Sequence, residues 1–267
     1  MPTAPAPASS PRPASLHFAA IAPEAAGMPL YRVVKRALLQ AIEGGTWAPG
    51  STLPSETELA LAFGVSIGTL RKAVDELSTE HILVRRQGRG TFVATHSPDR
   101  FLFQFFHVER ADGLREAPSV ELLSFDRVKL DDAQAEMLNL RAGHAAFQFE
   151  NRLALQGRAV MLDRLTLPAG LFKGLTEKRL RERPSTLYQL YQSEFGITVV
   201  HAHERARAAA ADRHVSRLLG IAAGLPVMQV HRVALTFGDK PVEHRESIIN
   251  TAQHDYVSLL SRKDAAR

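Results

Sequence analysis

The sequence contains no cysteine among its 267 residues. This absence excludes disulfide bonds, thiolate metal sites and cysteine nucleophiles, and it is typical of proteins from a reducing cytoplasm. No apolar run approaches the roughly 20 residues that a membrane-spanning helix needs. The N-terminus also lacks the long apolar core of a secretory signal. We therefore expect a cytoplasmic protein without a membrane partner.

Common signatures of catalysis are also missing. The sequence has no phosphate-binding glycine loop, no HExxH motif and no GxSxG motif. His201 and His203 lie two residues apart in a predicted strand and would share one face, but two histidines alone are a weak metal signal. We expect no catalytic residues, no cofactor and no metal site.

The charge excess is modest: the net charge is +5 and the pI about 9.7. Such a charge permits a polyanionic partner without identifying one. Lysine and arginine form no dense block of the kind found in disordered basic arms. Any nucleic-acid site must therefore be found in a particular motif.

Composition and periodicity divide the chain into four parts. Residues 1–27 are rich in Pro, Ala and Ser without a sustained period, and proline disfavours regular structure, so we expect a disordered tail. A compact block follows at 28–94, then a linker at 95–101 and a second domain at 102–262. In this second domain, predicted strands outnumber helices, which indicates an α+β fold with an antiparallel sheet.

The elements expected in the second domain are defined by apolar spacing. Its predicted strands cover residues 101–108, 120–129, 145–155, 160–167, 199–208, 227–237 and 242–249. Its predicted helices cover residues 133–139, 187–195 and 214–219.

Residues 28–94 carry the signature of a helix-turn-helix followed by a hairpin. A first helix follows Pro29 and ends at Gly44, and the capping box at 55–58 begins a short second helix that stops at Gly64. Ser66 caps a third helix, after a three-residue turn that contains glycine. Strands at 82–84 and 91–93 flank a turn at 85–90, and together they form a two-stranded wing with a basic tip.

These motifs resemble the GntR family of bacterial transcription regulators. The resemblance rests on PGSTLPSETELALAFGVSIGTLRKAVDEL at 49–77 and ILVRRQGRGTFV at 82–93. The later segments DRLTLP (163–168), STLYQLY (185–191), GLPVMQVHRVAL (224–235) and GDKPVEH (238–244) are similar to the UTRA effector domain of the HutC-type subfamily. The resemblance implies a winged helix-turn-helix, a chorismate-lyase-like sheet with a metabolite pocket, and a homodimer.

The predicted DNA-contact residues lie on the third helix, on the second helix and in the wing. Arg71 can fork onto guanine or hold a phosphate, while Ser66 and Thr69 can reach phosphates at the helix N-terminus. The glycines and arginines of the wing suit a minor groove. The full set is Thr57, Ser66, Ile67, Gly68, Thr69, Arg71, Lys72, Arg86, Gly88, Arg89 and Gly90.

The family often has arginines where this chain has Thr57 and Ile67, and only Arg71 keeps that pattern. Two interpretations of Ile67 remain open. Its side chain can contact a thymine methyl group, or it can pack against the second helix or the wing. Gly68 can allow close approach of the backbone to DNA.

For the effector site, the resemblance implies Arg152, Asp163, Thr186, Tyr188 and Glu243, with Arg164 and His244 as neighbours. A forked arginine suits a carboxylate, and two carboxylates suit an ammonium or hydroxyl groups. Ile249 occupies a position where sugar-phosphate-binding relatives often have tyrosine. We therefore expect a carboxylated or amino-acid-like metabolite.

The interpretation that accounts for most of the chain is a nucleoid-associated repressor. It would leave a double-stranded, inverted-repeat operator when a metabolite binds. Two alternatives remain: an enzyme on the lyase-like domain, by fold analogy alone, and an architectural DNA-binding protein without an effector.

Overall fold

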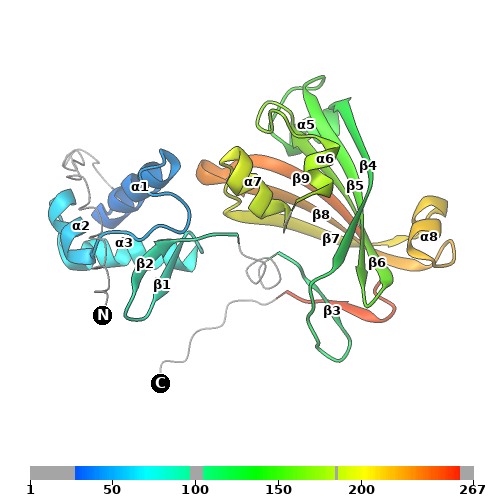
Figure 1. Ribbon diagram of the computed structural model, residues 1–267, viewed down its shortest axis with the longest axis horizontal. Helices are drawn as coiled ribbons and strands as arrows, with labels where there is room; N and C mark the ends of the chain where they lie inside the picture. Colours follow the sequence, from blue (N-terminus) through cyan, green and yellow to red (C-terminus); the bar gives the residue numbers. More distant parts are fainter. Residues whose placement is uncertain (1–27, 97–104, 184–185, 259–267) are drawn as a thin grey trace, which may run out of the picture. The chain divides into compact units, whose positions relative to one another are not determined.

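The computed structural model describes residues 28–96, 105–183 and 186–258 (Figure 1). Two compact units divide between Ala94 and Thr95. The expected tail at 1–27 and most of the expected linker, residues 97–101, lie outside the described residues, as do 102–104 and 259–262 of the expected second domain.

The first unit consists of three helices and a hairpin. Its elements are α1 (Leu30–Glu43), α2 (Glu56–Phe63), α3 (Ile67–Thr79), β1 (Leu83–Arg86) and β2 (Gly90–Val93). The capping box forms at the start of α2: the Glu58 amide donates to the Ser55 hydroxyl at 3.2 Å, and the Ser55 amide donates to the Glu58 carboxylate at 2.8 Å. These two bonds satisfy amides that a helix start leaves without partners.

The inner side of α3 packs against α1. Its four apolar residues are all buried: Leu70, Ala73, Val74 and Leu77. Fully burying one such leucine or valine contributes roughly 1.5–3 kcal/mol. This packing fixes which side of α3 remains open to solvent.

The turn of the hairpin is shorter than the predicted 85–90. Strand β1 continues through Arg86, which pairs with Gly90, so the loop contains only residues 87–89. The prediction was wrong here because cross-strand pairing extends into the basic, glycine-rich stretch, through Arg85 and Arg86. Gly88 and Gly90 have φ of +68° and +100°, a region that favours glycine.

The second unit contains a six-stranded antiparallel sheet in the order β4-β5-β6-β9-β8-β7. Its strands are β4 (Ser119–Lys129), β5 (Ala145–Leu155), β6 (Arg158–Pro168), β7 (His201–Ala210), β8 (Pro226–Thr236) and β9 (Lys240–Ile249). A separate two-stranded sheet pairs β3 (Val108–Arg110) with β10 (His254–Tyr256). The helical segments are α5 (Asp132–Met137), α6 (Glu177–Arg181), α7 (Leu187–Phe195), α8 (Arg213–Leu219) and the short 3-10 turn η1 (Phe237–Asp239).

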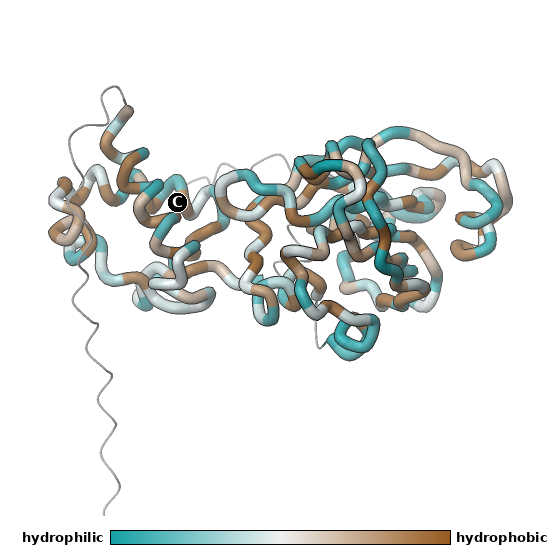
Figure 2. The backbone as a smooth tube through the Cα atoms, turned by 90° about the horizontal axis from the view of Figure 1, so that it is seen from above, coloured by the Kyte–Doolittle hydropathy of each residue, from teal (hydrophilic) through white to brown (hydrophobic). Residues whose placement is uncertain are grey.

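The two faces of the large sheet have different neighbours. Phe149 and Leu165 on one face pack in a core with Tyr188 of α7. Leu162, on the opposite face, packs with Val215 of α8. Figure 1 shows α8 well apart from α6 and α7, and the backbone in Figure 2 alternates between hydrophobic and hydrophilic stretches. Since successive strand residues point to opposite faces, the register decides which polar side chains meet.

The predicted fold class is confirmed: a helical unit with a hairpin wing precedes an α+β unit with an antiparallel sheet. The strand predicted at 101–108 was wrong, because among its described residues only Val108 is in a strand. Three short elements were missed, α6, η1 and β10, of five, three and three residues. Elements this short contain too little of a helical or strand period to reveal themselves.

Candidate functional site

The open side of α3 presents most of the residues predicted to contact DNA. Ser66, Ile67, Gly68, Arg71 and Lys72 are exposed, and Thr69 is half-buried. The Thr69 amide donates to the Ser66 hydroxyl at 3.1 Å, which caps the helix. The predicted contact residues of α3 therefore lie along its solvent side.

Ile67 and Gly68 form the leading edge of this helix. Ile67 is 43% exposed and lies outside the buried core of the unit. A Cβ atom added to Gly68 would meet only the Ser66 hydroxyl oxygen, at 3.9 Å. The fold of the unit thus leaves room for a side chain at position 68, and its internal packing gives no reason for glycine there.

Arg71 and Lys72 differ in their partners. The Arg71 side chain is 60% exposed, and its Nε donates to a Glu56 carboxylate oxygen at 2.9 Å. The Lys72 ammonium lies over the Tyr31 ring, 4.1 Å from its centroid. Arg71 thus extends toward α2, and Lys72 toward α1.

The wing and the start of α2 complete this surface. Thr57, Arg86, Gly88, Arg89 and Gly90 are all exposed. Arg86 lies over the Phe92 ring, with its guanidinium carbon 4.8 Å from the centroid. The adjacent Arg85 donates to Glu56 at 3.1 Å and also to Asp75, which connects the wing to both α2 and α3.

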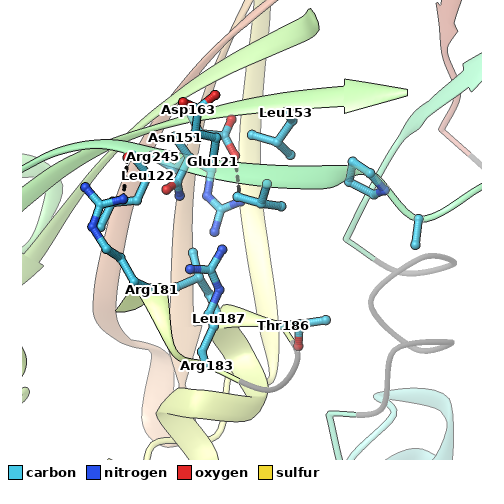
Figure 3. A pocket seen from close by; sticks show the side chains of 13 residues that line it. Glu121, Leu122, Asn151, Leu153, Asp163, Arg181, Arg183, Thr186, Leu187 and Arg245 are labelled. Atoms are coloured by element: carbon cyan, nitrogen blue, oxygen red, sulfur yellow. Dashed lines mark hydrogen bonds and ion pairs between the residues drawn. The ribbon is translucent and has the colours of Figure 1, made fainter. Parts of the chain in front are cut away.

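A cavity of about 580 Å³ opens on the α6–α7 side of the large sheet (Figure 3). Its apolar walls include Val120, Leu122, Leu153 and Leu187. Its polar lining includes Asn151, Asp163, Arg181, Arg183, Thr186 and Arg245. Apolar walls with a few converging polar groups are typical of a small-molecule site.

Buried charges form a network beside this cavity. Arg245 donates to Asp163 at 3.1 Å and to Glu243 at 2.9 and 3.2 Å, while the Ser247 hydroxyl donates to Asp163 at 2.5 Å. Burial disfavours the charge on Arg245, but Glu243 and the other neighbouring groups raise its pKa well above its usual value. Arg245 therefore remains charged between two carboxylates.

Glu243 also accepts hydrogen bonds from two buried tyrosines. The Tyr188 hydroxyl donates at 3.2 Å and the Tyr191 hydroxyl at 2.7 Å. Burial and the nearby Glu243 carboxylate raise the pKa of Tyr188 to about 12. Both hydroxyls thus stay protonated donors, and the fully buried Glu243 has no free side from which to bind a ligand.

Arg181 and Arg183 supply the remaining positive charge of the cavity. Arg181 pairs with Glu177 at 2.7 Å and donates to the Leu122 carbonyl at 3.1 Å. Half-buried Arg183 donates to the Leu180 carbonyl, and among the described residues no carboxylate lies within ion-pair distance of it. Burial lowers the pKa of Arg183, although an arginine still stays protonated at neutral pH.

Asn151 is the main uncharged polar group of the cavity. It is 1% exposed, and its side-chain oxygen has no hydrogen-bond partner among the described residues. Buried acceptors are nearly always paired in folded proteins. Within the described part of the chain, the cavity therefore combines an acceptor without a hydrogen-bond partner, Asn151, with an arginine without a counter-ion, Arg183.

Only some of the expected effector residues meet here. Asp163 and Thr186 line the cavity, and Tyr188 and Glu243 support it from the core. Arg152 alternates with the cavity residues Asn151 and Leu153 on β5 and does not line the cavity itself; it donates at 2.5 Å to Glu121, which is among the lining residues. Arg164 lies near Glu150 at 3.5 Å, and His244 lies beside His231 with their ring nitrogens 3.4 Å apart.

Register explains why these three residues are elsewhere. Residues 151 and 152, 163 and 164, and 243 and 244 are each neighbours on one strand, so the two members of each pair point to opposite faces of the sheet. Asn151, Arg183 and Arg245 were missed by the sequence-based prediction. Alternation along β9 was a usable signal for Arg245, because Glu243, Arg245 and Ser247 stand two residues apart.

Helix α7 links the cavity to the beginning of the second unit. Its N-cap, Thr186, lines the cavity. The Tyr188 ring lies 4.8 Å from that of Phe105 and 5.6 Å from that of His96. The His96 amide donates to the Gln192 side chain at 3.1 Å. Only Thr95 separates His96 from Ala94, the last residue of the first unit.

The described residues contain neither a helix suited to cross a membrane nor a group of side chains suited to hold a metal ion. None of the helices in ranges 28–96, 105–183 and 186–258 combines the length and apolar character needed to cross a membrane. Within the same ranges, no three His, Asp or Glu side chains group closely enough to hold a metal ion.

Comparison with known proteins gives matches for both units. Residues 30–93 match the bacterial regulatory proteins of the gntR family, and residues 114–255 match the UTRA domain. The histidine utilization repressor of Klebsiella aerogenes is 30% identical over 186 residues, covering 67% of this chain and 77% of that protein. The probable fructoselysine utilization operon transcriptional repressor of Escherichia coli K12 is 28% identical over 222 residues, covering 81% and 88%.

Solved structures agree with these matches. The ligand-binding domain of a Bordetella bronchiseptica protein assigned to the GntR-family regulators is 31% identical, with a TM-score of 0.57, and covers 60% of this chain and 99% of that one. PhnF from Mycobacterium smegmatis is 26% identical, with a TM-score of 0.51, and covers 85% and 99%.

Proposed function

Because the chain belongs to the GntR family of bacterial regulatory proteins and carries a UTRA domain, we propose how this DNA-binding transcription regulator is controlled. It is a homodimeric repressor that leaves an inverted-repeat operator when a small anionic metabolite fills the cavity of the second unit. Two-fold symmetry of the protein matches the symmetry of such an operator. Relatives named as repressors support the direction of control.

Arg183 carries the proposal for the effector. A half-buried guanidinium without a carboxylate partner among the described residues is costly unless an anion joins it. Arginine binds carboxylates and phosphates through two parallel hydrogen bonds. The effector therefore carries an anionic group that binds Arg183, in place of the role first given to Arg152.

Asn151 and Asp163 favour a donor group on the same molecule. The Asn151 oxygen lacks a partner among the described residues, and Asp163 also lines the cavity. An amino acid or a hydroxy acid has both parts, a carboxylate and an ammonium or hydroxyl donor. The name of one relative, a histidine utilization repressor, is compatible with this class of effector.

On the DNA side, Arg71 is the base-reading residue that we propose for α3. Its exposed guanidinium can fork onto guanine, while Ser66, Thr69 and Lys72 contact phosphates. The wing enters the minor groove through Gly88, Arg89 and Gly90, and Arg86 contacts the phosphate backbone of the DNA. Thr57 and Ile67 make weaker contacts, Ile67 with a thymine methyl group.

Release of DNA depends on α7. A ligand that contacts Thr186 at the start of this helix shifts Tyr188 and Gln192, which hold Phe105 and His96. The metabolite must bind the released state more tightly than the DNA-bound state, since equal affinity shifts no equilibrium.

The test uses the full-length protein with amino acids, hydroxy acids, simple carboxylates and neutral sugars as probes. Thermal shift identifies the binders, and an operator obtained by selection from random duplexes reports release. Arg183→Met should abolish binding of the active anion, whereas Arg164→Met, on the opposite face, should leave it intact. Binding that survives in Arg183→Met, or a preference for neutral sugars, would refute the anionic effector.

The two alternatives make different predictions. An enzyme would convert the bound metabolite, so intact recovery of the ligand after prolonged incubation counts against catalysis. An architectural protein would keep its operator at every metabolite concentration. We propose that the metabolite is recovered unchanged and that the protein releases its operator as the metabolite concentration rises.

A further inference from the structure

Glu56 connects the two basic parts of the DNA-binding unit. One oxygen of its carboxylate accepts from Arg71 Nε at 2.9 Å, and the other accepts from Arg85 Nη2 at 3.1 Å. Arg85 also donates to Asp75 on α3. A single carboxylate at the start of α2 thus joins the middle of α3 to the wing.

Stability does not explain this arrangement. The partner side chains are well exposed, 60% for Arg71 and 43% for Arg85. Exposed ion pairs contribute little to folding. A carboxylate beside Arg71 also repels the phosphates of approaching DNA, which lowers affinity for any sequence. A gain in recognition would offset that cost.

The geometry of the Arg71 guanidinium indicates how Glu56 improves recognition of DNA. Glu56 engages Arg71 through Nε, and Arg71 has no other hydrogen bond among the described residues. The edge formed by Nη1 and Nη2 therefore stays open. Guanine presents O6 and N7 in the major groove as a matching pair of acceptors. An arginine fixed at Nε loses less side-chain entropy when its outer edge binds a base.

We infer that Glu56 is a positioning residue that orients Arg71 toward a guanine. It also keeps Arg85 in contacts between the wing and helices α2 and α3, and so away from DNA. This inference rests on the proposed base-reading role of Arg71. It adds a specificity determinant at a position where the charge alone is unfavourable for binding.

The experiment begins with an operator selected by the full-length wild-type protein from random duplexes. Each guanine is then replaced in turn by 7-deazaguanine, which lacks the N7 acceptor. Wild-type protein should lose affinity by about tenfold at one guanine of each half-site. Arg71→Ala should bind more weakly and be insensitive to that replacement. Glu56→Gln should lose most of the same sensitivity, while its affinity for unrelated DNA stays equal or rises.

Two further variants separate positioning from charge and from folding. Glu56→Asp keeps the charge but withdraws the carboxylate, so it should lose sensitivity with wild-type affinity for unrelated DNA. Glu76→Gln removes a different ion pair of the same unit, with Lys35 at 3.0 Å, and should behave like wild type. Melting temperatures close to wild type should accompany all Glu56 variants.

The outcomes are distinguishable. Full 7-deazaguanine sensitivity in Glu56→Gln and Glu56→Asp, with sensitivity lost in Arg71→Ala, overturns the positioning role and leaves the proposed role of Arg71 standing. Retained sensitivity in Arg71→Ala refutes both. Loss of sensitivity in all three, with Glu76→Gln unchanged, supports the inference.

Discussion

The Arg245 guanidinium donates to the Glu243 carboxylate at 2.9 and 3.2 Å, although the two residues stand only two positions apart on β9. A separation of two places both side chains on the same face of the sheet. Both are buried, so the pair is protected from solvent screening. The carboxylate that was expected to bind a ligand instead belongs to the support beneath the cavity.

Removing Arg245 should therefore destabilise the second unit. Arg245→Met leaves Glu243 and Asp163 buried without their cation, a change that typically costs about 3–5 kcal/mol. Urea unfolding followed by far-UV circular dichroism should show an earlier transition for the second unit. Fluorescence of Trp47, the chain's single tryptophan, which is buried in the first unit, should report an unchanged transition.

A matched control is Arg164→Met on the exposed side of β6, where the loss should stay within about 0.5 kcal/mol. Equal unfolding curves for Arg245→Met and wild type would show that the buried network contributes nothing net.

How far the sequence could predict the molecule differs between the units. The helix-turn-helix was predictable because its signals are local: the capping box at 55–58, the cap at Ser66 and the stops at glycine all lie within a few residues of what they determine. The connections from Glu56 to Arg71 and Arg85 were not predictable, since they join residues 15 and 29 positions apart.

The cavity was harder to predict, because it depends on strand register. Asp163 meets Asn151 across β5 and β6, a pairing that neither strand encodes alone. Motif resemblance identified Asp163 and Thr186 but also included Arg164 and His244, whose side chains leave the opposite face. Arg183 follows a five-residue helix and has no periodic signal.

Gly68 offers a test of close approach between α3 and DNA. Gly68→Ala should stabilise the first unit by about 0.5–1 kcal/mol, because glycine inside a helix is unfavourable and the position has room for a methyl group. Operator affinity should nevertheless fall, by about tenfold or ~1.4 kcal/mol. Thermal unfolding and operator binding of the same preparation measure the two effects.

Thr79→Ala is the control for helix propensity, since Thr79 lies at the other end of α3. This variant should keep wild-type operator affinity. If Gly68→Ala also keeps it, the backbone at position 68 does not approach DNA closely.

Stability of the second unit should depend on pH through its histidines. Burial lowers the pKa of His107, His244 and His254 below the usual 6.5, and His231 adds to the effect at His244 against the opposing carboxylates of Glu246 and Asp131. The unfolded chain then binds more protons than the folded one just below pH 6.5. Stability should be full above that pH and should fall as the pH drops through the lowered values.

The measurement is the melting temperature between pH 7.5 and 5.5, a range that avoids most carboxylate titration. His244→Asn removes one of the three groups and should reduce the slope. A melting temperature that stays constant over this range, or rises toward pH 5.5, would contradict the expected sign.

The route from the cavity to the DNA-binding unit can be tested at Tyr188. Tyr188→Phe removes the hydroxyl that donates to Glu243 but keeps the ring between Phe105 and His96. Since Tyr188 does not line the cavity, the variant should still bind the effector. Its operator, however, should be released less well: a ligand that contacts Arg245 in the cavity also shifts its partner Glu243, and without the Tyr188 hydroxyl that shift is no longer passed to α7. Typical coupling changes affinity 5- to 150-fold, and we expect this factor to fall toward one.

Tyr191→Phe is the matched control, because its hydroxyl donates to the same Glu243 at 2.7 Å while its ring packs against Phe172 and Tyr188 rather than against Phe105. Both variants lose one buried hydrogen bond to a charged acceptor, which costs about 1.5–3 kcal/mol. Calorimetry of effector binding and operator titrations with and without effector separate binding from coupling. If coupling falls only in Tyr188→Phe, the path through α7 is supported. If coupling falls equally in both variants, the loss of a hydrogen bond to Glu243, which both share, is responsible. Tyr188 then has no special part in release of the operator.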